Sequence, residues 1–169
     1  MASERLSRRA LLGRLRGGPP QLRPPWALAE ELFTERCTQC EACIEACPER
    51  IIERGHAGYP IVLFDRAGCT FCGACRNACP EDCFEQGDAG QPWAQQATVK
   101  PICLETKGIA CRTCEAACEH RALEFRPKVG GGSNVTVNRK SCTGCGSCVA
   151  ACPLAAIVVL PTSTVESRP

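Results

Sequence analysis

The segment CTQCEACIEACP, residues 37–48, contains four closely spaced cysteines, and the same spacing recurs twice later in the chain. This repeated spacing decides the fold that the sequence predicts. The later copies are CTFCGACRNACP at residues 69–80 and CTGCGSCVAACP at residues 142–153. Each copy reads C-x2-C-x2-C-x3-C-P, and a fixed pattern that recurs within one chain indicates an internal structural repeat. The three copies supply the thiols of Cys37, Cys40, Cys43, Cys47, Cys69, Cys72, Cys75, Cys79, Cys142, Cys145, Cys148 and Cys152.

This spacing is typical of the loops that bind [4Fe–4S] clusters. Two-residue gaps let a short loop present three thiolates to one cluster, and small residues such as Gly73 and Gly144 let backbone amides approach the sulfur atoms. A structural zinc site usually pairs two separated C-x2-C segments around one ion. A radical enzyme that uses S-adenosylmethionine needs C-x3-C-x2-C, an order that the sequence lacks. The spacing therefore favours iron–sulfur clusters.

A fourth group of cysteines, in CLETKGIACRTCEAACEH at residues 103–120, is less regular. Cys111, Cys114 and Cys118 keep the last two gaps of the motif, but Cys103 lies eight positions before Cys111. The longer loop can still deliver a thiolate, because the entropic cost of closing a loop rises slowly with its length. We predict a fourth cluster loop here. The alternative is that Cys103 is merely buried and its cluster is absent or has three irons.

The four motifs use 16 of the 17 cysteines and leave Cys83 over. Cys83 follows Cys79 by one helical turn, and we predict a buried apolar thiol there rather than a ligand or a redox sensor.

The fourth cysteine of each motif is expected at a helix start, where it ligates the other cluster of a pair. The Pro that follows it suits a first helical turn. This rule predicts four ligand sets: Cys37, Cys40, Cys43 and Cys79 for cluster one; Cys69, Cys72, Cys75 and Cys47 for cluster two; Cys103, Cys111, Cys114 and Cys152 for cluster three; and Cys142, Cys145, Cys148 and Cys118 for cluster four.

The predicted fold class is α+β, with two tandem bacterial-type 2[4Fe–4S] ferredoxin-like units and a flexible basic N-terminal arm. Only eight residues are Phe, Tyr or Trp, too few for a large conventional core, so we expect the clusters to stabilise the fold and the iron-free chain to be largely unfolded. Strands are expected at 59–65, 122–127, 135–138 and 156–160. The predicted domains are the arm at 1–30, units at 31–83 and 98–161, a linker at 84–97 and a tail at 162–169.

The N-terminal arm is strongly basic. Residues 1–25 hold six arginines against one acid, whereas the remaining residues carry a net charge of −3. The arm is either a solvated, disordered tail or a contact for nucleic acid, anionic lipid or an acidic protein face. No aromatic stacking platform accompanies it, which argues against nucleic acid.

Export and membrane insertion are not expected. Arg8 and Arg9 lie in SRRALL, which looks like a twin-arginine export box, but a charged and Pro-rich stretch follows where an apolar one is needed. The most apolar segment, residues 149–160, is too short to span a bilayer. Without secretion, a disulfide framework is also disfavoured.

Taken with SRRALL, the segments RPPWA (23–27), HAGYP (56–60), CLETKGIACRTCEAACE (103–119) and FRP (125–127) resemble the NapF-type ferredoxins. The resemblance implies four [4Fe–4S] clusters and a cytoplasmic protein. It also implies that the chain binds the catalytic subunit of periplasmic nitrate reductase before export and helps to mature that subunit's cluster. Arg8, Arg9 and Trp26 are the candidate partner contacts.

We predict that the chain is not an enzyme, because His56 and His120 lack a paired nucleophile or acid. Two other functions stay open: a general electron carrier or electron-transfer subunit of another oxidoreductase, and a binding module whose clusters only stabilise the fold.

Overall fold

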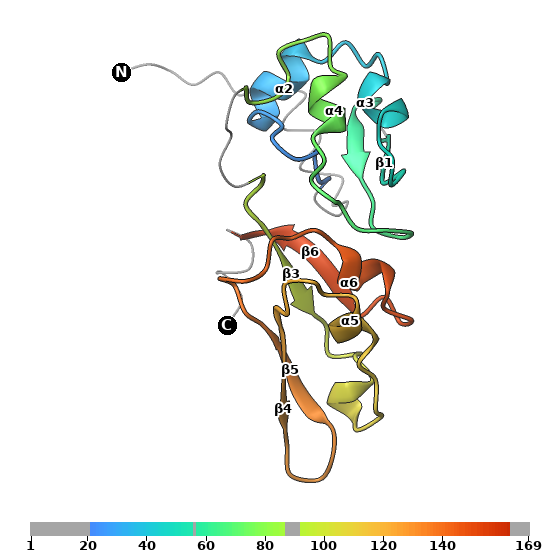
Figure 1. Ribbon diagram of the computed structural model, residues 1–169, viewed down its shortest axis with the longest axis vertical. Helices are drawn as coiled ribbons and strands as arrows, with labels where there is room; N and C mark the ends of the chain where they lie inside the picture. The colour runs from blue at the N-terminus through green and yellow to red at the C-terminus, as the bar shows by residue number, and fades with distance from the viewer. Residues whose placement is uncertain (1–20, 56, 87–91, 163–169) are drawn as a thin grey trace, which may run out of the picture.

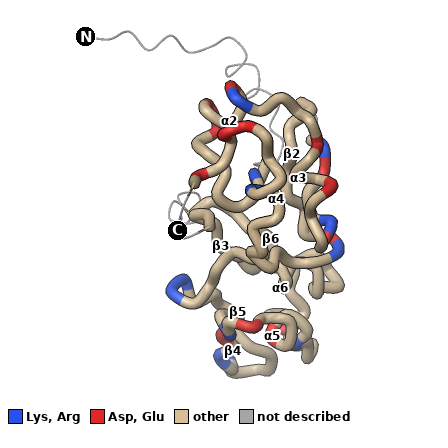
Figure 2. Tube along the Cα trace, turned by 45° about the horizontal axis from the view of Figure 1, so that its top comes forward, with Lys and Arg blue, Asp and Glu red and all other residues tan. Residues whose placement is uncertain are grey.

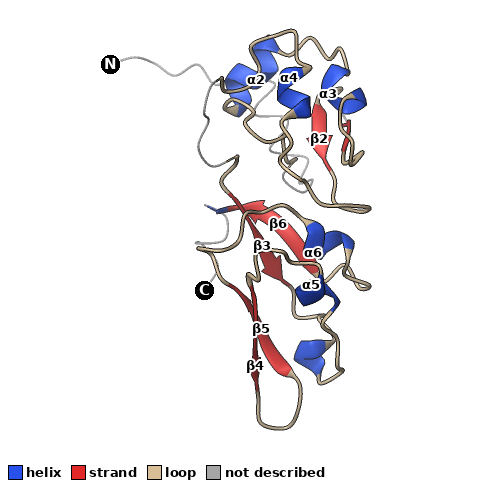
Figure 3. Ribbon diagram, in the orientation of Figure 1, coloured by secondary structure: helices blue, strands red, loops and turns tan. Residues whose placement is uncertain are grey.

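The chain folds into two units of similar construction, which follow one another along the longest axis of the molecule (Figure 1). The computed structural model describes residues 21–55, 57–86 and 92–162. Both units combine short helices with two-stranded antiparallel sheets (Figure 3), in agreement with the predicted α+β class. All 17 cysteines are free thiols.

The first unit contains two cysteine motifs and one strand pair. Its elements are α2 (Glu30–Arg36), α3 (Ala42–Glu45), β1 (Ile52–Arg54), β2 (Pro60–Val62) and α4 (Ala74–Asn77). The two strands pair antiparallel, with Ile52 opposite Val62. Both of these side chains are buried, so the strand pair closes over the core of the unit.

The second unit has the same plan with longer strands. Its strands at residues 123–127 and 133–137 lie close to the predicted ones at 122–127 and 135–138, and the turn between them holds three consecutive glycines, 130–132, with positive φ. The unit consists of β3 (Gln95–Val99), the 3-10 helix η1 (Glu105–Lys107), α5 (Thr113–Ala116), β4 (Leu123–Pro127), β5 (Ser133–Val137), α6 (Ser147–Ala150) and β6 (Ile157–Pro161).

Strand β3 pairs antiparallel with β6 and joins the two ends of the second unit. The sequence placed residues 84–97 in a linker, whereas the structure places Gln95–Ala97 in β3. The Gln-rich composition of this stretch is typical of a loop. Pairing with the apolar strand β6 nevertheless buries Gln96 and Ala97, and Ala97 lies opposite Val159. In the first unit, a single bridge between Ala27 and Phe84 joins the corresponding ends.

Each cysteine motif contains a helix of one turn that begins one residue before the third cysteine: α3, α4, α5 and α6. The fourth cysteine therefore follows the helix end instead of lying at a helix start. Pro48, Pro80 and Pro153 lie beyond the helix rather than in its first turn, which corrects the expectation from sequence. Pro is common just after a helix because it cannot continue one.

The last part of the predicted arm, residues 21–30, packs against the first unit. Leu22 and Pro24 are buried, and Arg23 bonds to Glu30 at 2.6 Å with its guanidinium 5.3 Å from the Phe33 ring centre. The prediction of a flexible arm is thus corrected for these residues. The segment that holds Arg8 and Arg9 lies outside the described residues.

The two units share part of one hydrophobic core. Trp93 and Val159, which lie in or beside the second unit, join the core of the first. The Trp93 ring meets Phe64 edge-on, with centroids 6.1 Å apart, and its Nε1–H donates to the Thr143 carbonyl at 2.9 Å. Within the described part of the chain, no helix is long and apolar enough to cross a membrane.

Candidate metal centres

Four cavities are each lined by four motif cysteines, three from one motif and the fourth from the neighbouring motif, and one of these cavities is also lined by Cys83. We number them by motif: cavity 1 holds Cys37, Cys40, Cys43 and Cys79; cavity 2 holds Cys69, Cys72, Cys75 and Cys47; cavity 3 holds Cys103, Cys111, Cys114 and Cys152; and cavity 4 holds Cys142, Cys145, Cys148 and Cys118. These are the four groups that the sequence rule assembles.

The loops of the regular motifs curl because selected residues adopt left-handed backbone conformations. In the second motif these are Phe71 (φ 54°) and Gly73 (φ 74°), one in each two-residue gap. The fourth motif uses glycine at both equivalent positions, 144 and 146, whereas the first uses Gln39 and Glu41. Alternating left- and right-handed residues turn successive N–H groups toward one concave side, which favours an anionic guest such as a thiolate-bound cluster.

The third cysteine of each motif lies deepest, on the one-turn helix. Burial, reinforced by the neighbouring thiols, raises the pKa of Cys43 and Cys148 to about 12, and burial is also the main cause that raises the pKa of Cys75 and Cys114 to about 11. The neighbours that raise them include the thiol from the adjacent motif, such as Cys79 for Cys43. Four ionised thiols are therefore unstable together unless positive charge lies among them.

A [4Fe–4S] core fits this donor set. Each cavity offers four thiolates around an apolar space, and the iron–sulfur core supplies the compensating positive charge. In the described residues, no three His, Cys, Asp or Glu side chains converge on one point as a single metal ion requires. The thiols instead surround a volume, which matches a cluster better than the tetrahedral zinc site weighed from the sequence.

The irregular third motif still brings Cys103 to cavity 3, and Glu105 explains how. Within the inserted segment, Glu105 is 6 % exposed. Its carboxylate accepts the Cys111 backbone N–H at 2.9 Å and the Ser133 hydroxyl at 2.9 Å, and these two bonds, the first above all, lower its pKa. Lys128 also donates to the Thr106 carbonyl. The insertion is thus fastened to β5, a role that cysteine spacing alone does not reveal.

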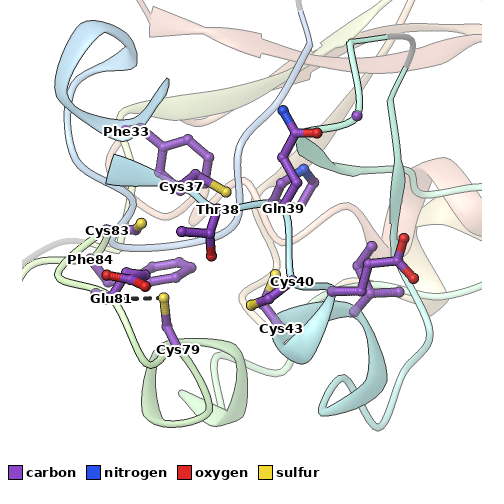
Figure 4. Close-up of a pocket in the computed structure, with 14 residues that line it drawn as sticks. Phe33, Cys37, Thr38, Gln39, Cys40, Cys43, Cys79, Glu81, Cys83 and Phe84 are labelled. Atoms are coloured by element: carbon purple, nitrogen blue, oxygen red, sulfur yellow. Dashed lines mark hydrogen bonds between the residues drawn. The ribbon is translucent and has the colours of Figure 1, made fainter. Parts of the chain in front are cut away.

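Cys83 is 1 % exposed and lies at the wall of cavity 1. Figure 4 shows the thiols of Cys37, Cys40, Cys43 and Cys79 around that cavity, with Cys83 beside Phe84. Burial raises the pKa of Cys83 to about 12, with Cys79 the next cause. Cys83 is therefore buried as predicted, but it also lies beside the first cluster site, which the sequence did not indicate.

Two other predicted residues have definite positions. Trp26 is half-buried in the wall of cavity 2, edge-on to Phe71 and 5.0 Å from the Arg76 guanidinium. His120 is exposed at the rim of cavity 4. His56 lies outside the described residues.

Comparison with known proteins agrees with this geometry. Residues 36–84 and residues 107–156 each match a family model described as a 4Fe-4S dicluster domain. Two dicluster domains give four clusters, so the chain is a four-cluster [4Fe–4S] ferredoxin-type protein, as the sequence predicts.

The full-length comparison identifies the family. The chain is 43 % identical to the ferredoxin-type protein NapF of Escherichia coli (strain K12), across 89 % of this chain and 92 % of that protein. It is 41 % identical to NapF of Haemophilus influenzae, across 82 % and 78 % respectively. The methylamine utilization ferredoxin-type protein MauM of Methylorubrum extorquens is 34 % identical, across 83 % and 72 %. The chain belongs to the NapF family of ferredoxin-type proteins, which confirms the resemblance drawn from its motifs.

Replacing Cys79 by Ser should cost one cluster, because this thiol closes cavity 1 from the second motif. We expect about 12 irons per chain instead of about 16. The matched change Cys83→Ser should leave about 16 irons, since four other thiols already surround the cavity. Iron and sulfide analysis of anaerobically purified protein measures both; equal losses in the two variants would contradict the assignment.

Replacing Glu105 by Ala should loosen cluster three selectively, because the Cys111 amide and the Ser133 hydroxyl lose their common acceptor. We expect the third cluster to release iron to a chelator about 10-fold faster, as lost outer-shell partners commonly cause. Glu105→Gln, which keeps an acceptor oxygen, should lie between this variant and the original chain. Glu115→Ala, which removes an exposed partner of Arg112, is the control and should release iron at the original rate.

Cluster loading should release protons and improve as pH rises. Burial raises the pKa of the Cys43 thiol from its ordinary 9.0 to about 12, so this ligand is protonated at neutral pH. It must lose that proton to bind iron. With limiting iron and sulfide, iron uptake should increase from about pH 6.5 to about pH 8.5. Cys83→Ser should show the same slope; a pH-independent uptake would refute the argument.

Proposed function

We propose that this protein is a cytoplasmic accessory protein that binds the catalytic subunit of periplasmic nitrate reductase before export. In that complex it supplies electrons or assists assembly of the subunit's own iron–sulfur cluster. The observation that carries the proposal is the set of four thiol-lined cavities in a chain of the NapF family. Membership supports the partner, and the cavities support the redox chemistry.

In this proposal the sixteen motif cysteines are the cluster ligands, with the fourth thiol of each motif crossing to the adjacent site. When bound, the clusters supply one-electron redox chemistry. The chain's own residues hold and shield them. The one-turn helices bury the third thiol of each site, and apolar walls such as Ile44, Val99 and Val137 limit water at the sites.

We assign no catalytic step to the protein itself. Every cavity described above has thiols as its reactive groups, and thiols that bind iron are not free as nucleophiles. His120 is exposed at the rim of cavity 4, and we assign it no nucleophile to activate.

A general electron carrier is the second candidate, and the similarity to MauM favours it. That relative belongs by its name to methylamine utilization, and it is 34 % identical to this chain. Similarity to a ferredoxin-type protein of that system favours a carrier that is not dedicated to one partner.

Charge supports a docking role for the N-terminal segment. In the described residues, acidic positions gather on the first unit around α2, which contains Glu30, Glu31 and Glu35 (Figure 2). Four oxidised sites with four thiolates each add about −8 to this body. The basic segment before residue 21 then differs sharply in charge from the body, and it offers a separate contact for an acidic face of the partner.

The partner is tested by capturing the precursor of the nitrate reductase catalytic subunit with the full chain and with a chain that lacks residues 1–20. The cut keeps Leu22 and Pro24, which are buried against the first unit. We expect capture by the full chain and at least 10-fold weaker capture after the cut, as the loss of several charge contacts implies. Arg8→Ala with Arg9→Ala should weaken capture more than the matched pair Arg14→Ala with Arg16→Ala. Recovery of unrelated redox proteins alone would support the general carrier instead.

We also propose that the clusters hold the fold together. The buried residues include the third cysteine of every motif, so cluster ligands are themselves part of both hydrophobic cores. Stripping iron anaerobically with a chelator and a reductant should abolish most of the far-ultraviolet circular dichroism signal, because the thiols lose the charge that keeps them together. A cooperative thermal transition in the iron-free chain would contradict this proposal.

A further inference from the structure

Two cluster-binding loops from different units touch directly. The backbone N–H of Cys69, a lining residue of cavity 2, donates to the carbonyl oxygen of Cys145, a lining residue of cavity 4, at 2.7 Å. A continuous path therefore runs from the Cys69 sulfur through its Cβ, Cα and N, across this hydrogen bond, and through the carbonyl and side chain of Cys145 to its sulfur.

Glycine makes this approach possible. A Cβ placed on Gly68 would lie 2.7 Å from the Ser147 backbone N and 2.9 Å from its Cα, and closer still to its hydroxyl. Across the same contact, a Cβ on Gly146 would overlap the Phe64 ring. Any larger residue at position 68 must push the fourth motif away from the second.

An aromatic contact joins the same two cavities by a second route. Phe71, in the wall of cavity 2, meets Trp93 edge-on with ring centroids 5.5 Å apart. Trp93 in turn donates its indole N–H to the carbonyl of Thr143, which lines cavity 4. The polypeptide between the two units already tethers them. Direct contact between their motif loops therefore indicates a further role.

We propose that the unit interface is an electron-transfer junction, which connects the four clusters in the order one, two, four, three. Within each unit, the crossing cysteines and the paired helices, α3 with α4 and α5 with α6, make the two sites neighbours. The Cys69–Cys145 contact supplies the missing step between units. This inference rests on the cluster positions of the proposed function.

The proposal implies a simple electron balance. A one-electron donor reduces a cluster at one end, each step oxidises one cluster and reduces the next by one electron, and a one-electron acceptor removes the electron at the other end. Clusters one and three are the ends of the series, so donor and acceptor can bind at opposite units.

The test uses full-length chains that each retain two clusters. Cys40→Ala with Cys111→Ala removes a ligand from cavities 1 and 3 and should leave clusters two and four, with about eight irons. Cys72→Ala with Cys142→Ala is the matched control and should leave clusters one and three. After reduction with dithionite, electron paramagnetic resonance should show spin–spin splitting in the first variant and two independent signals in the control.

The junction itself is tested by adding Gly68→Val to the first variant, which should reduce the splitting severalfold while iron content is unchanged. If that chain loses its clusters, Trp93→Leu in the same background serves instead and should also reduce the splitting. Gly68→Ala in the four-cluster protein is the milder change at the contact, and it should reduce the splitting at unchanged iron content. Independent signals in the pair two–four, or equal splitting in both pairs, would overturn the inference. Fewer than about 12 irons in the unaltered chain would instead count against the cluster assignment of the proposed function.

Discussion

Burial of one thiol among three others, which disfavours its ionised form, is the constraint on which the rest of this structure depends. Each site gathers four sulfur atoms, one of them deeply buried, where their joint ionisation is unfavourable without a compensating positive core. The left-handed loop residues, the one-turn helices and the crossing of the fourth cysteine all serve to surround that core. Because the third cysteine of every motif lies inside a hydrophobic cluster, we expect cluster binding and folding to be coupled.

Cysteine spacing predicted most of the site. In a tight loop, the number of residues between two cysteines limits which thiols can lie around the same cavity. The structure brings the same four sets of thiols together around the cavities, Cys103 included despite the insertion. The sequence did not reveal Glu105, because an acid in a polar loop has no spacing signal and its partner Ser133 lies 28 positions away. It also missed β3, whose glutamines are made strand-like only by pairing with β6, and the packing of residues 21–30, which depends on tertiary contacts of Leu22 and Pro24.

The two units reach the same arrangement with different amounts of sheet. In the second, five residue pairs join β3 to β6, whereas the first has a single bridge between Ala27 and Phe84 in the corresponding place. The first unit compensates with aromatic contacts, in which Phe33 meets Phe84 and Trp26 meets Phe71. Packing of side chains thus replaces backbone pairing where strands are short.

The sharing of Trp93 and Val159 with the first unit has a consequence for the history of the chain. A duplicated gene yields two modules that could once have been separated, recombined or lost singly. Here the second half supplies Trp93 and Val159 to the interior of the first, so the first half cannot stand alone without exposing apolar side chains. A stand-alone descendant of the first half would have to cover that surface in another way.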